Sequence, residues 1–199
     1  MKLLLHPLPV RIFHWTMFAS VITLLFTGLY LHYPFDVVRL PVSIMRKVHL
    51  VFGFILSVNL LGQIYYYVYT GKYTEVLVSR HDLPHLRSFF RYYLFITEHH
   101  PNFGRYNPGQ KLLFTAWGLA VLTGAITGMG LFVPDHSQWL QKLLGGLHVM
   151  RLIQFFIAMF FVATIPLHLY LVFTEEPAKL QAMFTGFLNK EPKLPPLQK

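Results

Sequence analysis

The segment RLIQFFIAMFFVATIPLHLY, residues 151–170, is apolar over the length of a membrane-spanning helix, yet it contains Gln154 and His168. A helix needs about 20 mostly apolar residues to cross the hydrocarbon core of a bilayer. Polar side chains are costly inside a membrane, and they usually face the interior of a helix bundle, where they mark functional sites. The segment therefore predicts a membrane helix whose polar side chains face a site inside the protein.

The whole chain has the composition of an integral membrane protein. Of its 199 residues, 54% are hydrophobic and 13% are charged, whereas soluble domains have about 25% charged residues. We predict an all-α membrane protein in which residues 1–187 form one four-transmembrane-helix bundle and residues 188–199 form a disordered cytoplasmic tail. No internal repeat is evident. The apolar runs are Ile12–Leu31, Val48–Tyr69, Leu112–Phe132 and Leu147–Phe173.

Lysines and arginines predict the orientation of the helices. With both termini in the cytoplasm, and with Arg151 just inside the last apolar run left aside, twelve of these residues fall on the cytoplasmic side and four on the outer side, in agreement with the positive-inside rule. The N-terminal segment lacks the small-residue cleavage site of a signal peptide. We therefore expect a multi-pass protein of a bacterial cytoplasmic (inner) membrane. Its net charge of +9 reflects topology and attraction to the lipid bilayer, and we expect no nucleic-acid partner.

The connection between the second and third apolar runs is long for a helix bundle. Within it, LPHLRSFFRYYLF, residues 83–95, interleaves apolar and aromatic residues with Arg87 and Arg91. This pattern predicts a short amphipathic helix on the cytoplasmic surface of the membrane.

Histidine is the residue type that would hold an electron carrier in this chain. There is no cysteine, which excludes iron–sulfur clusters bound by this chain. A six-coordinate haem iron takes two imidazoles from facing helices at equal depth. Four histidines fall in the apolar runs: His14, His49, His148 and His168. The others are expected in loops or at interfaces: His6, His32, His81, His85, His99, His100 and His136.

Depth and helical rotation arrange these residues into two levels. His14 and His168 lie near the cytoplasmic face, whereas His49 lies near the outer face and needs a partner near the start of the last helix. Position 154 precedes His168 by fourteen residues. In an α-helix this spacing leaves the two side chains about 40° apart around the helix axis, and thus on the same face, with a rise of about 21 Å along it. His148, twenty residues before His168, points away from that face unless the helix is distorted. A glutamine, Gln154, thus occupies the expected ligand position.

The chain resembles the di-haem cytochrome b subunits of membrane-bound nickel–iron hydrogenases, formate dehydrogenases and thiosulfate reductases, a cytochrome b561-like bacterial family. The resemblance covers nearly the whole chain. It is carried by PVRIFHWTMF (9–18) with TGLYL (27–31), RKVHLVFGFIL (46–56), RYNPGQKLLF (105–114) and IPLHLYLVF (165–173).

The resemblance implies a role for individual residues. His14 and His168 correspond to the ligands of a cytoplasmic-side haem b, and His49 corresponds to one ligand of an outer haem b. The other outer ligand corresponds to Gln154, so the family pattern is broken there. The YN-x-GQK segment corresponds to a quinone site in formate dehydrogenases of this type, which makes Asn107, Gly109 and Gln110 candidate quinone-binding residues. An N-terminal cap for the third helix explains the same segment equally well.

Basic side chains are candidate partners of the haem propionates, because buried carboxylates favour bidentate cations. Arg151 lies near Gln154, and anchoring at the membrane interface is an equally good explanation for it. The other candidates are Arg11, Arg46 and Lys47.

Three outcomes are open for the broken outer position. In the first, the outer haem is present and is held by His49 with either His148 or no sixth ligand. In the second, only the haem at His14 and His168 remains. In the third, the chain is a haem-free membrane anchor.

The function implied by the resemblance is electron transfer across the membrane. An outer-face iron–sulfur subunit, itself attached to a catalytic subunit, would exchange electrons with menaquinone or ubiquinone through the two haems. A transporter is disfavoured because the acidic residues, for example Asp82 and Asp135, lie outside the apolar runs. A stand-alone cytochrome b561 would need paired histidines in the middle helices, and the third run has none.

Overall fold

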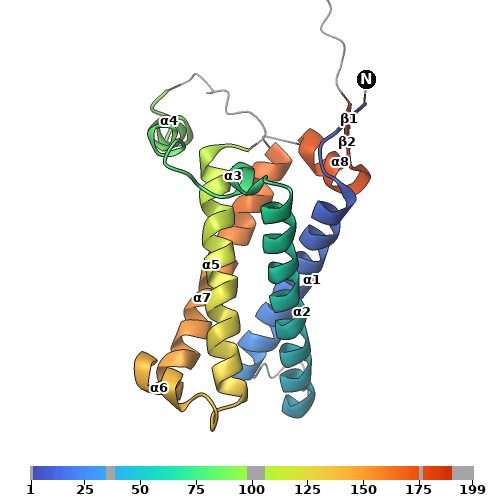
Figure 1. Cartoon of the computed structure of the whole chain (residues 1–199). Helices are drawn as coiled ribbons and strands as arrows, with labels where there is room; N and C mark the ends of the chain where they lie inside the picture. The colour runs from blue at the N-terminus through green and yellow to red at the C-terminus, as the bar shows by residue number, and fades with distance from the viewer. Residues whose placement is uncertain (1, 35–38, 98–105, 175–176, 190–199) are drawn as a thin grey trace, which may run out of the picture.

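The four predicted membrane helices are present in the computed structural model, which describes residues 2–34, 39–97, 106–174 and 177–189. They are α1 (Leu8–His32), α2 (Val42–Tyr69), α5 (Pro108–Phe132) and α7 (Leu147–Thr174). Each is long and apolar enough to cross a bilayer. They form one bundle in which α1 packs on α2 and α5 packs on α7 (Figure 1). The fold class predicted from sequence is therefore confirmed, although three of the four helices begin four to six residues before the apolar runs.

Short elements cover the two ends of the bundle. Helices α3 (Tyr73–Val76) and α4 (Leu83–Tyr93) lie at the same end as α8 (Pro177–Thr185) and the N-terminus, whereas α6 (Gln138–Leu144) lies at the opposite end (Figure 1). Helix α4 is the amphipathic helix expected within residues 83–95.

The described parts of the two chain ends pair with each other. Strand β1 (Lys2–Leu4) runs antiparallel to β2 (Phe187–Asn189). The predicted disordered tail, residues 188–199, was therefore assigned two residues too early, because backbone hydrogen bonds hold Leu188 and Asn189 in β2. Residues 190–199 lie outside the described residues.

The two helix pairs are equivalent, which the sequence alone did not reveal. Helices α1 and α5 each have 25 residues, and α2 and α7 each have 28. Five buried positions of one pair have a buried counterpart in the other, at an offset of 100 residues between α1 and α5 and of 105 residues between α2 and α7. The equivalent pairs are Val21 and Val121, Thr27 and Thr127, Tyr30 and Gly130, Met45 and Met150, and Leu56 and Phe161.

An apolar layer crosses the middle of the bundle. It consists of Val21, Leu56, Trp117, Val121 and Phe161, one or two from each long helix. Along α1 this layer lies between His14 and Thr27, and along α7 it lies between Gln154 and His168. It therefore separates the two levels of polar residues predicted from the sequence.

Helix α4 packs on the start of α5 through an aromatic ring. Phe89 is the buried residue of α4, and a Cβ placed on Gly109 would overlap its ring. Glycine at position 109 therefore lets this ring reach the backbone of α5.

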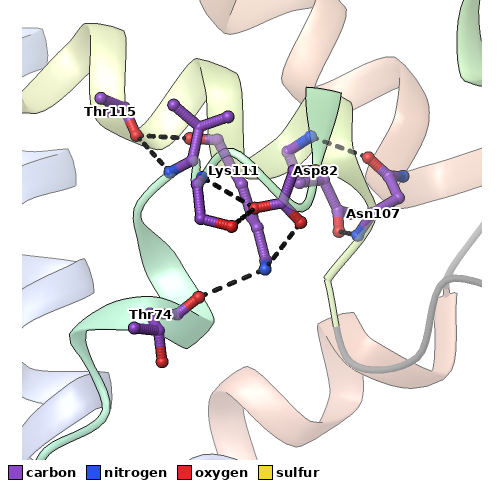
Figure 2. A network of polar contacts seen from close by, with 8 residues as sticks. Thr74, Asp82, Asn107, Lys111 and Thr115 are labelled. Atoms are coloured by element: carbon purple, nitrogen blue, oxygen red, sulfur yellow. Dashed lines mark hydrogen bonds and ion pairs between the residues drawn. The ribbon is translucent and has the colours of Figure 1, made fainter. Parts of the chain in front are cut away.

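The loop before α4 is attached to α5 by a polar network (Figure 2). The Lys111 ammonium lies 3.0 Å from a carboxylate oxygen of Asp82 and donates to the Thr74 carbonyl at 3.2 Å. The Asp82 carboxylate also accepts hydrogen bonds from the hydroxyl and the backbone N–H of Ser79. Burial raises the pKa of Asp82, but these hydrogen bonds and the charge of Lys111 together hold it below its ordinary value.

We predict that Asp82→Asn loosens the attachment of α4. The amide cannot replace the charge-assisted hydrogen bonds, each of which typically contributes about 1.5–3 kcal/mol. Trypsin should cleave the variant faster at Arg87 and Arg91, while the exposed-site control His81→Ala behaves like wild type. Because the folded-state pKa is lowered, the wild-type attachment should hold above the ordinary carboxyl pKa of 3.8 and weaken only as the pH falls below that value. Equal cleavage of Asp82→Asn and wild type would contradict this role.

Candidate haem sites

His14 and His168 form the first polar level. His14 is on α1 and His168 on α7, two helices that pack together. The two histidines lie within range of an electrostatic interaction with each other. Trp117 of α5 packs against the His168 ring with 5.3 Å between ring centroids, and its indole N–H donates to Thr164 at 2.9 Å. The structure thus brings together the two histidines that the sequence assigned to one site.

Two polar atoms at this level are buried and lack hydrogen-bond partners within the described residues. They are the Nδ1 atom of His14 and the Nε atom of Arg11, one turn earlier on α1. Arg11 also donates through Nη1 to the carbonyl of Phe184. Burying a polar atom without a partner is costly, so both atoms favour a further polar group at this level.

His49 lies at the second level, with a defined tautomer. Its Nδ1 lies 2.8 Å from the Thr27 hydroxyl, whose oxygen lies 2.7 Å from the Thr23 carbonyl. A carbonyl can only accept, so Thr27 gives its single proton to Thr23 and must accept one from Nδ1–H of His49. The lone pair of the ring is therefore on Nε2, the nitrogen that would bind a metal.

Gln154 is held in the other helix pair in the same way. Its Nε2 donates to the Thr127 hydroxyl at 2.9 Å and to the Gly124 carbonyl at 2.7 Å. The Thr127 hydroxyl in turn donates to the Thr123 carbonyl at 2.7 Å. Both N–H groups of the Gln154 amide therefore donate to acceptors on α5.

A glycine follows each of these two threonines in the sequence. A Cβ on Gly28 would lie 3.2 Å from Cε1 of His49, and a Cβ on Gly128 would lie 3.2 Å from Nε2 of Gln154. The threonine and glycine admit the side chain of the neighbouring helix and fix its direction. Gln154 thus occupies the position in its helix pair that His49 occupies in the other. Sequence reasoning missed Thr27 and Thr127, although the Thr-Gly pair recurs 100 residues apart.

The other candidates near the second level face outward. His148 and Arg151 are exposed on the first two turns of α7, and Arg46 and Lys47 are exposed on α2. His148 is exposed on α7, and we expect it to point away from the face of Gln154 and His168 because of its rotation around the helix.

The candidate quinone segment has a local structural role. Asn107 caps α5 by accepting from the backbone N–H of Gln110 at 2.7 Å, and the Gln110 side chain accepts from the backbone N–H of Asn107 at 3.1 Å. This reciprocal pair is a capping box. Gly109 contacts Phe89 of α4. The helix-cap explanation is therefore sufficient for these three residues.

One other histidine lies where the sequence did not place it. His6 was expected to be solvated or interfacial, but it is 2% exposed and its ring lies 6.4 Å from that of Tyr106. Pairing of the chain ends buries it, because Leu5 and His6 both donate to the Gly186 carbonyl. His32, His81, His85 and His136 are exposed as expected, and His99 and His100 lie outside the described residues.

Comparison with known proteins identifies the family. A profile described as Prokaryotic cytochrome b561 matches residues 5–186. The chain belongs to this family. It is therefore a multi-pass membrane protein of a cytochrome b family, which implies b-type haem as its cofactor.

Two curated relatives are similar over part of the chain. Each is described as a "Probable Ni/Fe-hydrogenase B-type cytochrome subunit", one from Azotobacter chroococcum mcd 1 and one from Azotobacter vinelandii. They are 24% and 23% identical over 152 residues, which is 69% of this chain. The match spans 63% of the length of each relative.

The donor set of this cytochrome b561 family member suits haem iron. Imidazole nitrogens are common axial ligands of haem, and Arg11 offers a cation near His14 for a carboxylate. Within the described residues, no three histidine or acidic side chains cluster as they would to hold a bare metal ion.

We predict that Thr27→Val destabilises the bundle. The change keeps the side-chain shape but leaves Nδ1–H of His49 without an acceptor, which costs about 1–3 kcal/mol. Thermal unfolding in detergent should show a lower midpoint than wild type. Thr23→Val is the matched control, because within the described residues the Thr23 hydroxyl bonds only the Ala19 carbonyl of its own helix. Equal midpoints for the two variants would contradict the assigned hydrogen bond.

Proposed function

We propose that this chain is the electron-transferring cytochrome b subunit of a membrane-bound oxidoreductase complex, linking an outer-face partner to the quinone pool. The observation that carries the proposal is the proximity of His14 and His168 on adjacent helices, beside buried polar atoms that have no hydrogen-bond partner within the described residues. Membership of the prokaryotic cytochrome b561 family supports it.

His14 and His168 would hold a b-type haem at the first level. When bound, it supplies an iron that exchanges one electron. Arg11 lies one turn from His14 and would neutralise a carboxylate there. Trp117 packs against His168 and fixes the orientation of its ring. The apolar layer between the levels keeps water out of the bundle interior, which strengthens these electrostatic interactions.

The partner is expected to be an iron–sulfur subunit joined to a catalytic subunit at the outer face. The descriptions of the Azotobacter relatives favour a nickel–iron hydrogenase over a formate dehydrogenase or thiosulfate reductase. We expect both termini, α3, α4 and α8 to lie on the cytoplasmic side of an inner membrane, because the distribution of lysines and arginines favours that orientation. Electrons would then pass from the His49 level to the His14 level.

Menaquinone or ubiquinone would react at the cytoplasmic-side level. The capping box uses the side-chain oxygens of Asn107 and Gln110 as acceptors. The amide N–H₂ group of Asn107 takes no part in the capping box and could donate to a quinone carbonyl. Reduction at this end would take up cytoplasmic protons. The separation of the two levels by about 21 Å along α7 would make the reaction charge-separating.

The test is a haem assay on the purified complex. We predict that His14→Ala and His168→Ala each lose a haem and the associated low-spin α-band in the dithionite-reduced spectrum, because each removes one of the two imidazoles that would hold it. His148→Ala, an exposed histidine on the same helix as His168, is the control and should match wild type. Retention of the full low-spin spectrum in both alanine variants would contradict the proposal.

A further inference from the structure

We propose that the second level holds a haem through His49 alone, and that Gln154 leaves the opposite axial position open to a small diatomic ligand, for which carbon monoxide is the probe. This inference rests on the proposed function, because it assumes that the chain binds haem. It selects among the outcomes that the sequence left open at position 154.

His49 is prepared to bind iron. Its hydrogen bond to Thr27 places the lone pair on Nε2, which has no hydrogen-bond partner among the described residues. Gly53 lies one turn along α2 on the same helix face, and a Cβ there would meet no atom within 4 Å. A histidine kept only for packing would need neither a fixed tautomer nor open space beside it.

Gln154 is turned away from any ligand role by its own hydrogen bonds. Both amide protons bond to α5, at Gly124 and Thr127. If the amide were reversed, its oxygen would face the Gly124 carbonyl, and two acceptors would repel each other. The remaining ligand would be a neutral amide oxygen, which binds haem iron far more weakly than imidazole does.

No other described imidazole takes this place. His148 and His32 are both exposed, and the His32 ring packs on Phe155 with 4.9 Å between centroids. The sixth position at this level therefore has no strong protein ligand in the described chain.

The equivalence of the two helix pairs supplies a sharp test. A histidine at position 154 would find the same surroundings as His49, with the Thr127 hydroxyl to accept from Nδ1–H and Gly128 to admit the ring. Gln154→His should therefore complete a bis-histidine site without any other change.

The experiment measures carbon monoxide binding to the dithionite-reduced, purified complex. Wild type and the non-ligating control Gln154→Leu should bind about one carbon monoxide per chain. His49→Ala should lose this binding together with one haem, while the low-spin α-band of the His14 and His168 site remains and shows that the variant is folded. Gln154→His should keep the wild-type haem content, lose carbon monoxide binding and gain low-spin absorbance.

Three results would overturn the inference. They are a wild type with a single low-spin haem and no carbon monoxide binding, binding that survives His49→Ala, and binding that survives Gln154→His in a folded variant. The first leaves the proposed electron-transfer function standing. Absence of haem from wild type would instead defeat the proposed function itself.

Discussion

A polar side chain inside a bilayer must find a hydrogen-bond partner within the protein. Thr27 provides this partner for His49 in one helix pair, and Thr127 provides it for Gln154 in the other. Each hydroxyl donates to its own helix and accepts from the neighbouring one, at His49 or Gln154. Each contact fixes the rotation of one helix against the next, because the glycine after the threonine admits the side chain. The arrangement of the second polar level follows from these two contacts.

The two helix pairs share a backbone arrangement but differ in a few side chains, which explains how one bundle can have two different polar levels. The repeat preserves the threonine, the glycine and three buried apolar positions, but it places imidazole in one half and amide in the other. At the first level, Phe114 of α5 stands at the position equivalent to His14 of α1. The imidazoles at that level therefore come from His14 and His168 on adjacent helices, with the apolar layer between them and the second level.

The sequence predicted the helices and the ligand candidates because both depend on local pattern. Apolar runs of membrane length gave all four spans, and helical rotation placed Gln154 on the face of His168 and His148 off it. The sequence could not show that Gln154 donates to the Gly124 carbonyl, because this hydrogen bond joins two residues that lie 30 positions apart on different helices. It also missed the burial of His6, which depends on pairing between the two ends of the chain. The segment from Asn107 to Gln110 admitted two explanations, and the capping box supports the structural one.

The most direct test of the account is an electron cryomicroscopy map of the complex at side-chain resolution. The account predicts planar porphyrin density between the rings of His14 and His168, with an imidazole nitrogen on each side of the iron. A map in which lipid or protein side chains fill that space, or in which His14 faces outward from the bundle, would contradict it.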